Sequence, residues 1–463
     1  MKKFITILVL TFAIINCIAQ APTTITAGMS GAQVRTALNA NFGITDTASF
    51  NMIQFRKSTS HGVGIIFKGA IPWMHDYPGW NAGGGYTAGG IGASRGKSLY
   101  IGKWAGANAV VTENLYEGQN TAVGDSALAK VTTGMANTAI GMGALSKITT
   151  SSLNTAVGRQ ALYLFAGTEA GNNTSVGESA LERLRTGTSN TALGTNAGMF
   201  LKEGSNNTLI GYNAGYGYAQ PPGYVTELST YTGSTVVGST AYANVKEGGN
   251  NIAIGLGAMS TTKIAGSESI AIGTSALKAN KISYNIGIGS YVAEVDTTGQ
   301  MNIFIGSNVA RASQGSSRST VIGYNAASTM TNGLENVIIG SYAGNTITSG
   351  DENTFIGRSA GSSITTGSGN IFIGCASGYY ETGSNKLFID NTTRTNEADA
   401  RIKALIYGVF AAAPVNQRVT INAVLKLTPM ADPPGSPEEG MIYADTDHHL
   451  YYYNGSTWKQ LDN

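Results

Sequence analysis

The sequence has little charge, little proline and almost no cysteine. Only 12% of its 463 residues are charged and the formal net charge is +2, which leaves no basic surface for nucleic acid. Ten prolines accompany 62 glycines and 42% hydrophobic residues. This composition argues against a disordered linker, and collagen would need glycine at every third position. Short strands joined by frequent turns fit it better.

Apolar runs long enough to span a membrane are lacking as well. The longest run, residues 4–15, follows two lysines and is too short for a comfortable span. It is typical of an export signal, which predicts that residues 1–19 are removed and that the protein is secreted or lies at the cell surface. Lipidation at Cys17 is the alternative, although Asn16 fits a lipidation motif poorly. Cleavage leaves Cys375 as the single cysteine, so no intrachain disulfide is expected.

A glycine-centred motif recurs along residues 98–383. It reads "NTAVGDSAL" at 120–128 and "NTAIGMGAL" at 137–145, and ten of the fourteen spacings between its fifteen copies are 17 residues. Four residues before the glycine stands Asn in twelve copies and Ser in three, and Ala follows three residues after it in twelve. "SLYIGKWAG" at 98–106 is a plausible earlier copy, centred on Gly102. The repeat glycines are Gly124, Gly141, Gly158, Gly177, Gly194, Gly211, Gly238, Gly255, Gly273, Gly289, Gly306, Gly323, Gly340, Gly357 and Gly374.

A fixed period of this size indicates a solenoid, and 17 residues are too few for a pair of helices. We therefore predict an all-β fold, a parallel β-solenoid with roughly 15–16 coils of two short strands and two turns each. At about 4.8 Å per coil the rod would be roughly 70 Å long. Stacked asparagines would form a hydrogen-bonded ladder along it. The predicted structural positions include Asn120, Gly124, Asn137, Gly141, Asn154, Gly158, Asn353 and Gly357.

Alternation within each strand predicts two faces. The residue just before the glycine is always Ile, Val or Leu, and it shares a face with the residue two positions earlier. We expect this pair to fill the inside of the coil. The residue between them then points outward, and it is apolar too, as in Ala122, Phe304 and Phe355. Apolar residues on both faces imply that both are covered, and self-association of identical rods is the simplest cover.

The flanks of the array are different in character. A capping box at Ser30, followed by apolar residues at helical spacing, predicts a short helix within a cap region at 20–97. The rest of this region is expected to be irregular β-structure. Residues 384–430 are expected to form array-closing strands. Residues 431–463 are expected to form a linker and a β-hairpin that turns at Asn454-Gly455.

The longest interruption of the repeat lies between Gly211 and Gly238 and is rich in tyrosine. Extra residues in a solenoid usually leave the coil as a loop. Tyrosine with glycine suits a contact surface, although a well-packed structural loop would have the same composition. The candidate binding residues are Tyr216, Tyr218, Tyr224 and Tyr231.

The motif Asn-Thr-Ala-Ile-Gly-x-x-Ala resembles the head repeat of trimeric autotransporter adhesins. It is also similar to repeats of bacteriophage tail-fibre-like proteins and their relatives in Bacteroidetes. Segments 28–42, 71–80, 384–391 and 433–461 resemble the flanks of the second group. The resemblance implies a left-handed parallel β-roll and a homotrimer.

Catalytic chemistry finds little support in the sequence. The four histidines lack metal-ligand spacing, and the acidic residues are scattered through turns. A hexapeptide-type acyltransferase would carry three aliphatic-glycine units in each coil, and a polysaccharide-cleaving β-helix would need clustered carboxylates. We therefore expect no enzyme, no metal and no cofactor. The leading hypothesis is a secreted trimeric adhesin or structural fibre that binds glycan or a surface protein, and the alternative is a tail-fibre-like component of a particle or injection system.

Overall fold

A computed structural model describes the backbone of strands 53–57, 64–68, 71–74 and 91–93, and residues 96–109, 118–168, 171–218, 229–261 and 266–461. The predicted export signal and the predicted helix after Ser30 lie outside the described residues. Near the N-terminus β1 (Ile53–Lys57), β2 (Gly64–Lys68) and β3 (Ile71–Met74) form a small antiparallel sheet.

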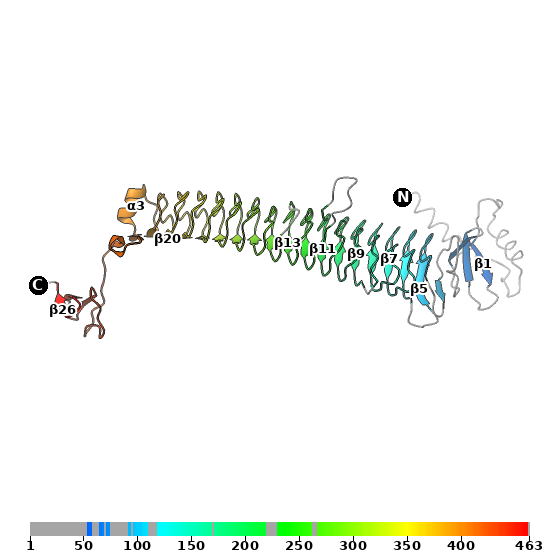
Figure 1. Cartoon of the computed structure of the whole chain (residues 1–463), viewed down its shortest axis with the longest axis horizontal. Coiled ribbons are helices and arrows are strands. Elements are labelled where there is room, and N and C mark those ends of the chain that lie inside the picture. The colour runs from blue at the N-terminus through cyan, green and yellow to red at the C-terminus, as the bar shows by residue number, and fades with distance from the viewer. Residues whose placement is uncertain are drawn as a thin grey trace, which may run out of the picture.

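A parallel β-solenoid occupies most of the chain (Figure 1). Its first strand is β5 (Gly96–Ile101), which ends just before Gly102 and belongs to the predicted earlier copy of the repeat. This strand also pairs antiparallel with β4 (Ile91–Ala93). Strands β5 to β20 then pair in parallel and in register, so each repeat residue lies beside its counterpart in the next coil. The strands are Thr121–Val123 (β6), Thr138–Ile140 (β7), Thr155–Val157 (β8), Thr174–Val176 (β9), Thr191–Leu193 (β10), Thr208–Ile210 (β11), Thr235–Val237 (β12), Ile252–Ile254 (β13), Ile270–Ile272 (β14), Ile286–Ile288 (β15), Ile303–Ile305 (β16), Thr320–Ile322 (β17), Val337–Ile339 (β18), Thr354–Ile356 (β19) and Ile371–Ile373 (β20).

The number and length of the coils agree with the prediction, but the make-up of a coil does not. Each described coil from β6 onward contains one three-residue strand, and turns form the rest. The expectation of two strands in each coil was therefore wrong. Outside the named strands, isolated bridges such as Thr186 with Glu203 and backbone hydrogen bonds between turns, such as the one that Leu128 N donates to Ala144 O at 3.0 Å, join neighbouring coils.

The two strand faces are the reverse of the prediction. The middle residue of each strand, such as Ala122, Phe304 or Phe355, is fully buried inside the coil. The residues on either side of it are half-buried or exposed, and Ile140 and Leu193 remain 40% and 47% exposed. The expectation that this flanking pair fills the interior was therefore wrong.

The turn after the glycine also supplies residues to the interior. Leu128, four residues after Gly124, has a left-handed backbone with φ of 52°, and both Ala127 and Leu128 are buried. A left-handed residue turns the chain so that two consecutive side chains point inward, which breaks simple alternation. The same geometry recurs at Leu145, with φ of 50°.

The middle strand residue and the residue four after the glycine share the interior volume. Where the first is small, as in Ala139, the second is large, as in Leu145. Where the first is Phe355, the second is Gly361, and a Cβ there would lie 2.8 Å from the Phe355 ring. Most coils therefore fill a similar space by one of two routes, as close packing favours. Three coils depart from this exchange, since Ala192 with Gly198 and Gly287 with Ala293 are both small and Val236 with Tyr242 are both large.

The repeat glycine is required by close contact between coils. Gly141 has φ of 129°, and a Cβ on it would lie 2.4 Å from the carbonyl oxygen of Gly158. Any side chain would therefore collide with the backbone of the next coil and strain its own.

The predicted asparagine ladder is present. The side-chain oxygen of Asn137 accepts hydrogen bonds from the backbone nitrogen of Asn154 at 3.0 Å and from its Nδ2 at 3.1 Å. The Nδ2 of Asn137 also donates to the carbonyl oxygen of Ser151 at 2.9 Å. The same contacts join Asn353 to Asn370. Each buried amide thus donates to a carbonyl oxygen of a nearby turn and accepts from a backbone nitrogen of the next coil.

The C-terminal end closes the array as predicted, with one unforeseen helix. Strand β21 (Lys386–Ile389) pairs in parallel with β20, and β22 (Ile406–Val409) and β23 (Arg418–Ile421) follow antiparallel. Between β21 and β22 lies α3 (Glu397–Lys403), which caps that end of the rod (Figure 1). A short 3-10 turn, Pro414–Asn416, precedes β23.

The terminal module has three strands where the sequence predicted a two-stranded hairpin. β24 (Ile442–Ala444), β25 (Leu450–Tyr453) and β26 (Trp458–Gln460) are antiparallel. The predicted turn at Asn454-Gly455 joins β25 to β26, and Oδ1 of Asn454 accepts from the backbone nitrogen of Thr457 at 2.8 Å.

Candidate functional site

One long apolar surface of the described chain has no cover. We call it the outer strand face: the residues one and three positions before each repeat glycine, from Thr121 to Ile373. The position before the glycine is always Ile, Val or Leu, and the other is Thr, Ile or Val. At roughly 70 Å by 10 Å this face would have about 700 Å². Nine of the fifteen residues three positions before the glycine are Thr, so the continuous aliphatic part of the face is the row one position before the glycine.

A second uncovered apolar stretch follows the array. Every residue of β23 is exposed. Just beyond it Val424 is 94% exposed and Leu425 is 65% exposed. These residues belong to or follow the same sheet as the outer strand face, because β20 to β23 pair in succession.

The tyrosines of the predicted binding loop do not form one surface. Tyr231 is fully buried, its ring lies edge-on to Tyr242 with centroids 5.1 Å apart, and its hydroxyl donates to the carbonyl oxygen of Gly215. Burial raises the pKa of Tyr231 well above its ordinary value. Tyr231 is thus a core residue, and its predicted place on a contact surface was wrong.

Two of the other three tyrosines are among the described residues, and both are half-buried. Tyr216 is half-buried, because its ring packs edge-on against Phe200 with centroids 4.9 Å apart, and burial raises its pKa. The backbone nitrogen of Tyr218 donates to Oγ of Ser229 at 2.7 Å, and the Tyr218 side chain is half-buried. Tyr224 lies outside the described residues.

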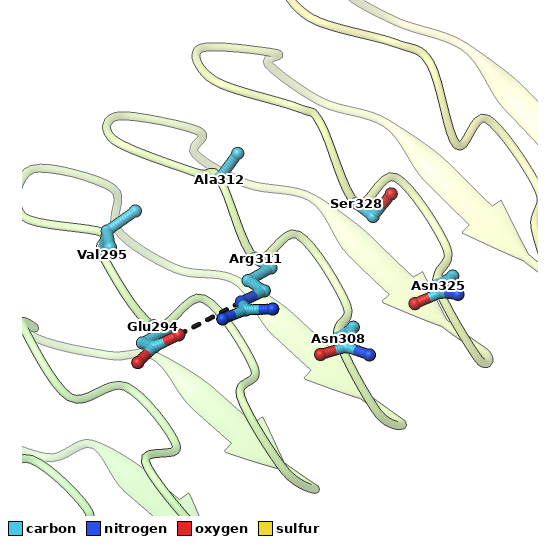
Figure 2. Close-up of a pocket in the computed structure, with 7 residues that line it drawn as sticks. All are labelled: Glu294, Val295, Asn308, Arg311, Ala312, Asn325 and Ser328. Carbon is cyan, nitrogen blue, oxygen red and sulfur yellow. Dashed lines mark hydrogen bonds and ion pairs between the residues drawn. The ribbon is translucent and has the colours of Figure 1, made fainter.

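A groove of about 510 Å³ lies on the flank of the rod, spanning the coils of β15 to β17 (Figure 2). We call it the flank groove. All of its lining residues follow the repeat glycines, whereas the outer strand face precedes them. They are Glu294, Val295, Asn308, Arg311, Ala312, Asn325 and Ser328.

Charge inside the flank groove is internally balanced. Nε of Arg311 lies 3.1 Å from Oε2 of Glu294, and Nζ of Lys278 lies 3.7 Å from its Oε1. The Arg311 guanidinium also lies over the Tyr291 ring, 5.1 Å from its centroid. Both cations are therefore engaged with the protein itself.

Two primary amides face the groove from successive coils (Figure 2). Asn308 and Asn325 both have left-handed backbones, with φ of 55° and 51°. Within the described residues, neither side chain forms a hydrogen bond. The equivalent pair Asn196 and Asn213 differs, since Nδ2 of Asn196 donates to Oδ1 of Asn213 at 3.2 Å.

Sequence reasoning missed the flank groove, although Val292 and Val309 replace the usual Ala in two of its coils. The next residue in these two coils is Ala293 or Ala310. A small residue also stands there in other coils, such as Gly198 and Gly361, so this position does not mark the groove.

Among the described residues, no group of three His, Cys, Asp or Glu side chains could hold a metal ion. No described helix has the length and apolar character to cross a membrane. Comparisons with family models, curated proteins and solved structures return no match. The surfaces above are therefore the basis for any proposal.

Proposed function

We propose that this chain is a secreted or surface-exposed fibrous protein with a structural and adhesive role and no enzymatic activity. In this proposal, identical rods associate side by side through the outer strand face into a homotrimer, and ligands bind on the exposed flanks, loops or tips. The observation that carries it is the uncovered aliphatic row one residue before each glycine, which includes Ile140, Leu193 and Ile356.

The area of this face supports the proposal. About 700 Å² per chain is close to the ~800 Å² that each partner buries in a standard protein interface. Burial of apolar area stabilises by about 25 cal/mol per Å², so the face is large enough to hold rods together. The exposed Val424 and Leu425 would extend the contact past the end of the array.

The number of chains rests on the resemblance to trimeric adhesins, which also implies a left-handed coil. A rotationally symmetric arrangement hides the same face in every chain and closes, so it does not grow into aggregates. Secretion rests on the predicted removal of residues 1–19.

Lysine substitutions on the outer strand face test whether the chains associate through it. Ile254 and Leu256 flank Gly255, and only Ile254 belongs to the outer strand face, while Leu256 is exposed on the turn. We expect the chain to have a solution mass of three copies. Ile254→Lys combined with Ile272→Lys should give single chains with an unchanged far-UV circular dichroism spectrum, and Leu256→Lys should leave the mass at three. A single-chain mass for the unmodified protein would contradict the proposal.

Cell fractionation distinguishes the adhesin hypothesis from the tail-fibre hypothesis. The adhesin hypothesis predicts the chain, cleaved after residue 19, in the cell-surface or secreted fraction. A tail-fibre-like component would instead sediment with assembled particles and keep residues 1–19.

A further inference from the structure

We propose that the flank groove binds an extended, neutral, β-linked oligosaccharide that lies along the rod axis. This inference names a ligand class and a site for the adhesive part of the proposed function and rests on it. It does not depend on the number of chains in the rod.

The polar groups of the groove match a ligand with many hydroxyls. Each primary amide offers two donors and one acceptor that takes two bonds. The side chains of Asn308 and Asn325 use none of these within the described residues, whereas Asn196 and Asn213 bond to each other. The two groove amides are therefore available for a ligand.

The spacing of the amides favours a polymer. The backbone nitrogen of Asn325 donates to Ser307 at 3.0 Å, and that of Tyr342 donates to Tyr324 at 2.8 Å, so these positions stack coil upon coil. Coils are about 4.8 Å apart, which is close to the advance of one hexose in an extended β-linked chain. Successive sugars would thus meet successive amides.

Tyrosine rings border the amide pair on both sides. Tyr291 and Tyr342 occupy the same repeat position as the two asparagines, one coil before and one coil after them, and are 39% and 41% exposed. The Arg311 guanidinium holds the Tyr291 ring from one side, and Tyr324 lies edge-on to Tyr342 with centroids 5.4 Å apart. Fixed aromatic rings suit the apolar faces of sugar rings, with little side-chain entropy to lose on binding.

The charge balance argues for a neutral ligand. Among the lining residues, the Glu294 carboxylate offsets the Arg311 guanidinium, and Lys278, which contacts the same carboxylate, lies outside the lining, so the lining itself has no net charge to attract an ionic ligand. The volume of about 510 Å³ lies within the range of small-molecule sites.

Glycine substitutions test the amides without disturbing the backbone, because glycine tolerates the left-handed conformation of both positions. The probes are cellohexaose, xylohexaose and chitohexaose, with α-linked maltohexaose as the mismatched probe, titrated by calorimetry into the full chain. We expect at least one β-linked hexasaccharide to bind, and maltohexaose to bind at least tenfold more weakly. Asn308→Gly with Asn325→Gly should weaken binding at least tenfold, and the matched control Asn196→Gly with Asn213→Gly should not.

Three results would overturn the inference. They are no binding of any β-linked probe, full binding by the Asn308 and Asn325 double variant, or a change in the solution mass of that variant, which would make the groove a contact between chains. Should the double variant unfold, Tyr342→Leu provides the second test, with the same tenfold loss expected. Rods that assemble but bind no sugar would refute the groove alone, whereas single chains that bind sugar would refute only the assembly.

Discussion

The buried asparagine is the residue on which each coil is aligned with the next. Its side chain is fully buried at Asn137, Asn154 and Asn353, where an unpaired amide would be costly. The oxygen orders the next coil, and the nitrogen satisfies a turn carbonyl. Serine takes this position at Ser319, where Oγ accepts from the backbone nitrogen of Asn336 at 3.1 Å.

Removing one amide should therefore cost more than shortening it. Asn154→Ala leaves the backbone nitrogen and Nδ2 of Asn173 without their acceptor, and we expect a loss of about 2–3 kcal/mol in the free energy of unfolding. Asn154→Ser keeps an acceptor and should cost about half as much. Denaturant unfolding checks both, and equal losses for the two variants would show that the ladder does not depend on the acceptor.

A buried carboxyl gives one residue-scale pH dependence. Asp296 is buried and accepts from the backbone nitrogen of Gly299 at 2.8 Å and from Oγ of Ser313 at 2.8 Å. Burial raises its pKa above the usual 3.8, although these hydrogen bonds oppose the shift. Because the folded pKa exceeds the unfolded one, this group stabilises the fold fully below pH 3.8 and loses that stabilisation as the pH rises through the folded value.

Asp296→Asn removes this dependence while keeping polar atoms in place. The variant should lose the part of the pH dependence of stability that lies just above pH 3.8, and it should be at least as stable as the unmodified chain at pH 7. Thermal melts at several pH values measure this. An unchanged pH profile, or a strongly destabilised variant at pH 7, would contradict it.

At the scale of elements, α3 is tied to the rod through an ion pair between a buried carboxylate and a partly exposed arginine. The Glu381 side chain is fully buried at the end of the solenoid, and both of its oxygens accept from Arg401 of α3 at 3.0 Å. The backbone nitrogen of Gly383 supplies one further hydrogen bond at 2.9 Å. Asn396 begins the helix by accepting from the backbone nitrogen of Asp399 at 2.8 Å, so α3 is fixed at its start and along one side.

Breaking this pair should release the cap. Arg401→Ala leaves the Glu381 carboxylate buried with one donor, and we expect about 3 kcal/mol of destabilisation. Lys403→Ala removes an exposed pair with Asp399 on the same helix and should cost less than about 1 kcal/mol. Hydrogen exchange of the amides in β21 and β22 measures the difference. Equal protection in the two variants would show that α3 is held by other contacts.

The whole molecule behaves as a stack of nearly equivalent units. Parallel in-register strands place every residue of a coil on its counterpart, so stability is the sum of coil and neighbour terms. Length is then adjustable in steps of one coil.

Removing one whole coil should leave a folded, shorter rod. Deletion of residues 137–153 places Asn154 on Asn120 and Gly158 on Gly124, which restores the same contacts. Deletion of residues 137–144 instead shifts the glycine off its counterpart. We expect the first variant to keep the circular dichroism spectrum and a cooperative melt, and the second to lose both. Similar behaviour of the two would contradict the requirement for register.

The period was readable from the sequence because each coil templates the next. The coil count, the strand at Gly102, the asparagine ladder and the turn at Asn454-Gly455 follow from local residue types, whereas the closing strand β21 was expected from the resemblance to tail-fibre-like proteins. The flank groove was not readable, because Asn308 and Asn325 occupy a position where Asn196 and Asn213 also stand. Only the side-chain geometry separates a bonded amide pair from an open one.

The sequence by itself determined that the strand has two apolar faces, and only the tertiary structure decided which one is inside. Alternation has a period of two and is the same read from either side. In the structure the middle strand residue points inward in every described coil, and the residue four after the glycine, such as Leu128 or Gly361, lies beside it in the same interior. In most coils one of these two residues is large where the other is small, as in Ala139 with Leu145 and Phe355 with Gly361. The sizes vary inversely because both residues lie in the same interior space. The Ile and Val residues on either side of the middle strand residue therefore lie on the outside of the coil. Because these rows are exposed, we expect rods to associate.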